Sequence, residues 1–141
     1  MKTIFNYLIT GILSLHLLMF AVALQASDYY VDSNNSAAND QNTGSIQQPW
    51  KTLDKANQTL IAGDTVFIKA GSYNSYIAPV NSGTANAMIT FKNYRKDKVI
   101  VSDAAFGIHL DGKSYIHVNG MYFKTLDKFI YLQNGANYNI L

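Results

Sequence analysis

The side chains of this 141-residue sequence that could do acid–base or electrostatic chemistry are few and scattered. Elimination from a sugar acid needs a base for the proton beside the carboxylate and a cation to neutralise that carboxylate. Hydrolysis of a glycoside needs two carboxylates about 5–10 Å apart. The residues of suitable type are Lys69, Lys92, Asp103, His109, Asp111 and His117. They form no recognisable constellation, so no catalytic residue is assigned from the sequence.

His117 is the one candidate for substrate binding. It alternates with Ile116 and Val118, so it points outward from a predicted strand and could meet a ligand in a groove. The alternative is a solvated surface histidine. Asp103 and Asp111 lie eight residues apart and could form a carboxylate pair, although both residues also suit turns.

A calcium site would draw on the polar segment 32–44, where Asp32, Asn34 and Asp40 offer oxygen ligands. No bidentate glutamate follows, and the alternative is a solvated loop. The absence of cysteine excludes disulfides, thiolate zinc sites and cysteine nucleophiles. We therefore predict no metal site and no cofactor in this chain, and consider calcium only for a full-length protein.

Composition indicates a β-rich protein with a packed core. Hydrophobic residues make up 48% of the chain and charged residues 14%. The acidic residues are all aspartate, and asparagine occurs fourteen times, a bias that favours turns over helices. The net charge of +2 is too small to indicate a nucleic-acid partner.

Residues 1–26 have the layout of a secretory signal peptide. Lys2 precedes an apolar stretch from Tyr7 to Leu24, and small residues follow. We expect cleavage after Ala26, with Ala23 as the second choice. An uncleaved membrane anchor is the alternative, because the apolar stretch is near the lower limit for spanning a bilayer. The prediction is a secreted protein, periplasmic or extracellular, with no membrane association once the signal is removed.

Short strand-like runs recur with a period of about 22 residues, as in a coil of stacked parallel strands. The first series has steps of 23, 27 and 22 residues. Its members start at Val66, Ile89, Ile116 and Tyr138, those of a second series at Tyr76, Val99 and Met121, and those of a third at Ile108 and Ile130. Within the first series, alternation places residues such as Val66, Ile140 and Tyr138 inside the coil and Asn139 outside.

One amphipathic helix is predicted near residues 53–60, because Leu53, Ala56 and Leu60 fall on one face. Thr52 can cap its start and Gly63 can end it. Such a helix would cover the open first turn of the coil. Trp50, just before it, is interpreted as a core anchor rather than a sugar platform.

Several segments together resemble the N-terminal part of secreted right-handed parallel β-helix proteins. They are Tyr29-Tyr30-Val31-Asp32-Ser33, Gln48-Pro49-Trp50-Lys51-Thr52-Leu53, Ala62-Gly63-Asp64-Thr65-Val66, Ala70-Gly71-Ser72-Tyr73 and Ser114-Tyr115-Ile116-His117-Val118-Asn119-Gly120. The family is the pectate lyase-like superfamily, including polysaccharide lyases of the chondroitinase B type. The resemblance implies an all-β right-handed parallel β-helix and an extracellular polysaccharide as partner.

We therefore predict a signal peptide at 1–26, an opening strand, loop and capping helix at 27–64, and the first three to four rungs of a β-helix at 65–141, truncated at the C-terminus. The resemblance implies that the parent protein is a lyase of acidic polysaccharide whose catalytic rungs lie outside this chain. The alternative is a non-catalytic surface or adhesion protein that binds glycans. The chain alone is expected to be inactive and prone to self-association.

Overall fold

A computed structural model describes residues 25–102, 105–124 and 127–141. Most of the predicted signal peptide and the candidate Asp103 lie outside these residues. The strands and helices are β1 (Asp28–Val31), α2 (Leu53–Thr59), β2 (Thr65–Ile68), β3 (Gly71–Tyr73), β4 (Ile89–Asn93), the 3-10 turn η1 (Tyr94–Lys96), β5 (Val99–Ser102), β6 (Phe106–Asp111), β7 (Ile116–Asn119), β8 (Met121–Lys124) and β9 (Lys128–Gln133).

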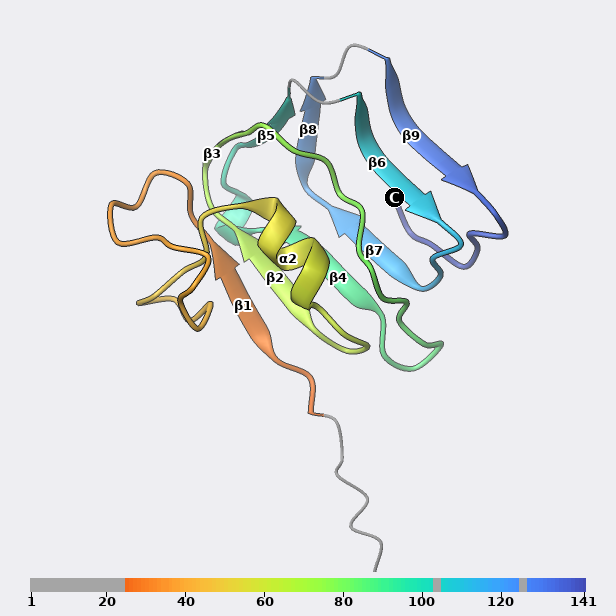
Figure 1. Cartoon of the computed structure of the whole chain (residues 1–141), viewed down its shortest axis with the longest axis horizontal. Coiled ribbons are helices and arrows are strands. Elements are labelled where there is room, and N and C mark those ends of the chain that lie inside the picture. The colour runs from red at the N-terminus through yellow and green to blue at the C-terminus, as the bar shows by residue number, and fades with distance from the viewer. Residues whose placement is uncertain (1–24, 103–104, 125–126) are drawn as a thin grey trace, which may run out of the picture.

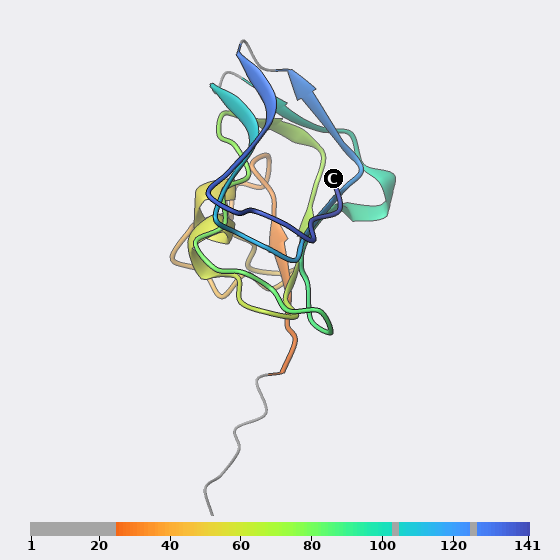
Figure 2. The same cartoon turned by 90° about the vertical axis from the view of Figure 1, so that its right-hand side faces the viewer.

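The strands form three parallel sheets that the chain visits in turn (Figure 1). The first sheet has the order β1-β2-β4-β7, the second β3-β5-β8 and the third β6-β9. The last two circuits, β4-β5-β6 and β7-β8-β9, each add one strand to each sheet, and Figure 2, turned by 90°, shows the successive circuits overlapping. This is a right-handed parallel β-helix, as predicted from the sequence.

The core is a set of inward-facing files, one residue per turn of the coil. Val66, Phe91 and Ile116 are fully buried, and Val118 is nearly so. Val66 pairs with Phe91, and Phe91 with Val118. The predicted alignment of Val66 with Ile89 is thus wrong by two residues, a shift that leaves both side chains facing inward.

The second predicted series also needs correction. Tyr73 pairs with Val101 in the second sheet, whereas Ile77 forms a bridge with Ile108 of the third. Tyr76 and Ile77 therefore begin the third series, not the second. The corner at 74–76 separates the two sheets here.

Helix α2 lies where the sequence predicts a cap, and Leu53 and Ala56 are buried. The Thr52 hydroxyl accepts a hydrogen bond from the backbone N–H of Lys55 at 3.2 Å. The helix ends at Thr59, and its C-cap residue Leu60 has an extended backbone, so Gly63 does not terminate the helix. Instead Gly63 has a φ of +94° in the turn before β2, which suits glycine.

Trp50 anchors the segment before the helix. It is 2% exposed, its ring stacks on Tyr29 at 4.5 Å between centroids, and its indole N–H donates to the Asn42 carbonyl at 2.9 Å. The interpretation of Trp50 as a core anchor is confirmed.

Asp64 links two segments at the N-terminal end of the coil through hydrogen bonds. Its carboxylate is 1% exposed, with one oxygen accepting from the backbone N–H of Ser27 at 2.9 Å and the other from that of Ile61 at 3.0 Å. The segment before β1 and the segment after α2 are therefore both fixed to the start of β2.

The predicted strand at 138–140 is reduced to one bridge, between Ile140 and His117. This register aligns Asn139 with Ile116, and the Asn139 side chain accepts from the Ile116 N–H at 2.8 Å. Because a shift of one residue reverses the faces of a strand, Ile140 shares the outward face of His117, and the inward placement predicted for it was wrong. Tyr138, also predicted to face inward, is 68% exposed.

Candidate functional site

Four rings form a continuous row on the outer side of the third sheet. Phe106 stacks on Tyr131 at 5.5 Å between centroids, His109 lies 4.7 Å from Phe106, and Tyr76 lies 5.7 Å from Phe106. His109 pairs with Tyr131 in the strand register, and their rings are 5.3 Å apart. The neighbours of His109 on β6, Ile108 and Leu110, are buried, which places His109 and its partner Tyr131 on the opposite face. The ring distances place Phe106 and Tyr76 beside them. We call these four residues the aromatic row.

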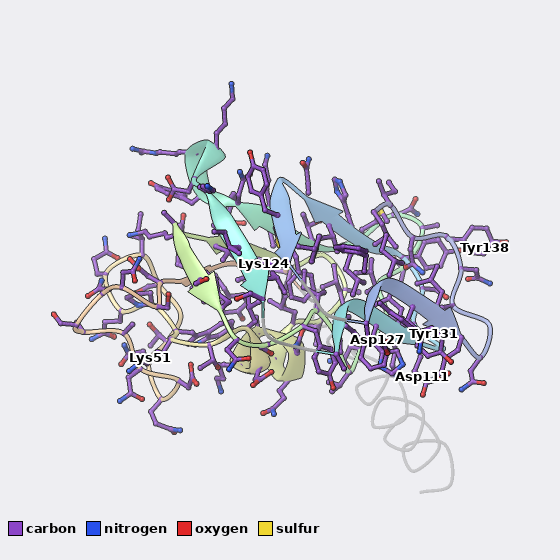
Figure 3. The ribbon with its side chains drawn as sticks, turned by 90° about the horizontal axis from the view of Figure 1, so that it is seen from above. Lys51, Asp111, Lys124, Asp127, Tyr131 and Tyr138 are labelled. Carbon is purple, nitrogen blue, oxygen red and sulfur yellow. The ribbon has the colours of Figure 1, made fainter. Side chains whose placement is uncertain are left out.

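Polar groups lie against the aromatic row. The ammonium of Lys128 lies 4.8 Å from the ring centroid of Tyr131 and 5.5 Å from that of Phe106, and 3.5 Å from the Asp127 carboxylate. Gln133 Nε2 lies 3.2 Å from His109 Nε2. Figure 3 shows Asp111, Asp127 and Tyr131 on the same side of the coil, far from Lys51.

A polar hollow of about 480 Å³ continues the row at Tyr76. Its wall is built from α2 and the segment 74–80, and its lining is Asp54, Asn57, Gln58, Asn74, Ser75, Tyr76, Ala78 and Val80. Asn57 is 6% exposed and fixes the corner, because its side chain donates to the Tyr76 carbonyl at 2.8 Å and accepts from the Ala78 N–H at 3.0 Å. Asp54 also accepts a hydrogen bond from the Ser75 hydroxyl.

The aromatic row and this hollow combine the two kinds of side chain that sugar-binding surfaces use. Aromatic faces pack against the apolar C–H faces of sugar rings, and amides, hydroxyls and carboxylates bind sugar hydroxyls. Lys128 adds a cation, and His109 adds an imidazole whose ring nitrogens can form hydrogen bonds. We name the aromatic row and the polar hollow together the groove.

Of the candidates taken from the sequence, the structure brings His109 into the aromatic row, and Asp111 lies two residues further along β6, outside the row and outside the lining of the hollow. Asp111 accepts a hydrogen bond from the Asn134 side chain. Lys69, Lys92 and His117 lie on the first sheet or directly after one of its strands, away from these two.

His117 is half-buried on β7, with Thr90 beside it in the register on one side and Ile140 on the other. Its outward orientation follows from the burial of Ile116 and Val118. Its role in substrate binding stays a prediction.

The side chains considered as calcium ligands form other contacts in the structure. Asp32 forms an ion pair with Lys69 at 3.3 Å, and the Asn34 side chain donates to the Ala70 carbonyl at 2.8 Å. Asp40 accepts from the backbone N–H groups of Lys51 and Thr52. Within residues 25–102, 105–124 and 127–141, no group of three His, Cys, Asp or Glu side chains could hold a metal ion.

Tyr73 lines a smaller hollow on the other side of Asn74 and Ser75. Burial raises the pKa of its phenol above the ordinary value, and donation from Ser33 offsets part of that rise. The Tyr73 hydroxyl donates to the Lys69 carbonyl at 2.8 Å, so it closes the corner between the first two sheets.

The sequence reasoning missed Tyr76, Phe106 and Tyr131 as members of a site. A signal was present, because His109 and Tyr131 are 22 residues apart and so fall at the same position on successive turns. Tyr76 gives no such signal, because the sequence pattern places its strand in the second series rather than the third.

Comparison with known proteins supports the fold and gives context for the site. No family model matches the chain. The chain is 40% identical over 78 residues to the uncharacterized protein YwoF of Bacillus subtilis, and 32% identical over 81 residues to the pectate lyase PEL9 of Emericella nidulans. These matches cover 55% and 56% of this chain but only 16% and 19% of the two relatives.

Two solved structures are similar. A rhamnogalacturonan lyase matches 81% of this chain with a TM-score of 0.66 and 21% identity, over 34% of its own length. XylC in complex with xylose matches 54% of this chain with a TM-score of 0.50 and 27% identity, over 12% of its length.

The fold is that of the pectate lyase-like parallel β-helix proteins, as the resemblance in the sequence predicted. The chain spans less than a fifth of the curated relatives' length. Among the residues that the structure describes, no helix is long and apolar enough to cross a membrane.

Proposed function

We propose that the chain is the N-terminal part of an extracellular, polysaccharide-active β-helix protein, and that the whole protein is a lyase of acidic polysaccharide. The observation that carries the proposal is the groove, in which stacked aromatic rings lead into a polar hollow on a lyase-like coil. The sequence similarity to a pectate lyase supports the reaction class.

In this proposal the chain binds the sugar polymer, and further turns of the coil supply the catalytic residues. A sugar ring lying on Phe106 and Tyr131 would place its polar edge near Lys128, whose ammonium can neutralise a carboxylate. The next sugar toward Tyr76 would reach the amides and hydroxyls of the hollow. Secretion and the use of calcium by the full-length protein belong to the same proposal.

The second candidate function is glycan binding without turnover, on a surface or adhesion β-helix. It is favoured by the environment of His109, which packs against the rings of Phe106 and Tyr131 and has Gln133 at one nitrogen. A side chain held in this way suits a binding surface as well as a base.

The test is to express the full-length product of the gene and incubate it with acidic polysaccharides. A lyase produces unsaturated uronate, which is followed by its ultraviolet absorbance. New reducing ends without this absorbance would instead indicate a hydrolase, and retention of the polymer with neither product would support the binding protein. Without any retention or product, the proposal fails.

A further inference from the structure

The positive charge of the chain is concentrated in one turn between the first and second sheets. Within residues 92–98 the exposed cations are Lys92, Arg95, Lys96 and Lys98. The single acidic residue of this segment is Asp97, so its net charge is +3, whereas the whole chain has +2. The rest of the chain is therefore net negative, and we call residues 92–98 the basic turn.

The basic turn contacts the preceding and the following circuits of the coil, which fix its position. On one side, Asp97 accepts a hydrogen bond from the Ala70 N–H at 3.1 Å. On the other side, the Asn93 side chain lies so close to Gly120 that a Cβ there would collide with it. Asn93 also donates to the Asp97 carbonyl at 3.0 Å, which closes the turn. The cations thus project from a fixed backbone, which lowers the entropy lost on binding.

Arg95 and Lys96 both have a left-handed backbone, with φ of +46° and +69°. This conformation is unfavourable for residues with a long side chain, and glycine or asparagine would adopt it with less strain. The turn geometry therefore does not explain why two adjacent cations occupy these positions. Figures 2 and 3 show the turn projecting from the body of the coil.

Aromatic rings lie directly beside these cations. The Arg95 guanidinium lies 4.9 Å from the ring centroid of Tyr94, and Lys69 approaches the same ring at 5.7 Å. Tyr94 packs edge-on against Tyr30 and Phe67, at 5.8 and 6.3 Å between centroids. Lysine and arginine bind carboxylates, arginine in a bidentate manner, while the rings offer an apolar face to sugar C–H groups.

The groove on the third sheet carries no comparable cluster of cations among the described residues. Asp54 lines its hollow, and Lys128, the cation beside its rings, is paired with Asp127 at 3.5 Å. An acidic polymer needs a compensating positive surface elsewhere, and the basic turn is the place where this chain provides one.

We propose that the basic turn, with Tyr94, is a second binding site that recognises the carboxylates of an acidic polysaccharide. The inference rests on the proposed function only in taking a glycan as the ligand. It adds that the basic turn contributes to the affinity for the acidic polymer, in addition to the contribution of the aromatic row.

The test uses affinity electrophoresis of the full chain in gels containing polygalacturonate, with neutral dextran as the comparison polymer. Arg95→Asn combined with Lys96→Asn removes two charges and keeps residues that accept a left-handed backbone. We expect the dissociation constant for polygalacturonate to rise about tenfold, and the wild-type affinity to fall as salt is raised. The matched control, Lys51→Gln with Lys55→Gln, removes the same charge near α2 and should leave affinity unchanged.

Circular dichroism and a thermal melt establish that the variant is folded, and its melting temperature should not fall. Unchanged affinity, an equal loss in the control, or no retardation of the wild type by polygalacturonate would overturn the inference. Equal retardation by duplex DNA would overturn the assignment to a glycan. Retention of polygalacturonate through the basic turn, with no unsaturated uronate from the full-length protein, would overturn the lyase proposal and leave this inference standing.

Discussion

Ile108 and Ile130 occupy the same position on successive turns of the coil, yet their environments differ. They pair in the parallel register of β6 and β9, and Ile108 is 1% exposed whereas Ile130 is 49% exposed. The next pair repeats the contrast, with Leu110 at 0% and Leu132 at 44%. A following layer is what buries these side chains, because each turn of a solenoid covers the one before it.

The exposed side chains of the last turn should cause the chain to self-associate. Fully burying an isoleucine or leucine contributes about 1.5–3 kcal/mol relative to leaving it exposed, and both residues are about half exposed. We expect size-exclusion chromatography to show oligomers that dissociate on dilution. Ile130→Lys with Leu132→Lys should give a monomer, whereas Val80→Lys, at a similarly exposed apolar site, should not. A soluble wild-type monomer at high concentration would contradict this prediction.

Tyr131→Ala should weaken binding of sugar polymers, because the ring stacks on Phe106 and lies under Lys128. A stacked ring contributes about 0.5–1.5 kcal/mol, so the dissociation constant should rise roughly three- to tenfold. Isothermal titration calorimetry with the polymer that binds the full chain measures this. Tyr138→Ala removes an equally large ring outside the groove and serves as control. Equal loss in both variants would show that the row has no special role.

Asn57→Ala should destabilise the fold by about 1–3 kcal/mol, because it leaves the Tyr76 carbonyl and the Ala78 N–H without their partner. Denaturant unfolding gives the free energy of unfolding. Asn86→Ala, which removes an exposed asparagine, is the comparison. An effect of Asn57→Ala no larger than that of Asn86→Ala would show that water replaces the Asn57 side chain.

The stability should decrease at alkaline pH through Tyr73. Its folded pKa is raised above the unfolded value of about 10, so above that pH the unfolded chain loses a proton that the folded chain retains. The neutral phenol makes its full contribution to the free energy of unfolding below pH about 10. This contribution decreases as the pH rises through the raised pKa of the folded state. Denaturant unfolding at a series of pH values from about 8 to about 11 brackets the ordinary tyrosine pKa. The free energy of unfolding should decline over this range in the wild type and decline less in Tyr73→Phe.

The period of the coil could be predicted from the sequence because equivalent positions share one environment. Val66, Ile89 and Phe91 all face inward, however, so alternation cannot distinguish a register of 23 residues from one of 25. The exact register is set by backbone hydrogen bonds between turns, which leave no mark in the pattern of apolar residues.

Other features depend on individual side chains. The side-chain amide of Asn139 accepts a hydrogen bond from the Ile116 N–H and donates one to the Lys113 carbonyl. These bonds hold the segment 138–140 one residue away from the register that the sequence pattern predicts. The corner at 74–76 is short and is fixed by Asn57, which is far away in sequence. The aromatic row depends on this corner, because the corner places the ring of Tyr76 against that of Phe106. The sequence pattern alone does not predict that contact.

The contact between Asp64 and Ser27 bears on the predicted cleavage of the signal peptide. If the leader is cut after Ala26, the Ser27 nitrogen that now donates to Asp64 becomes the terminal ammonium, 2.9 Å from a carboxylate that is 1% exposed. Proteolysis would then create a buried ion pair at the front of the coil, and the cut chain would hold β1 differently from its precursor. A cut after Ala23 would leave this nitrogen an amide. The choice of cleavage site would thus decide whether export also locks the first strand in place.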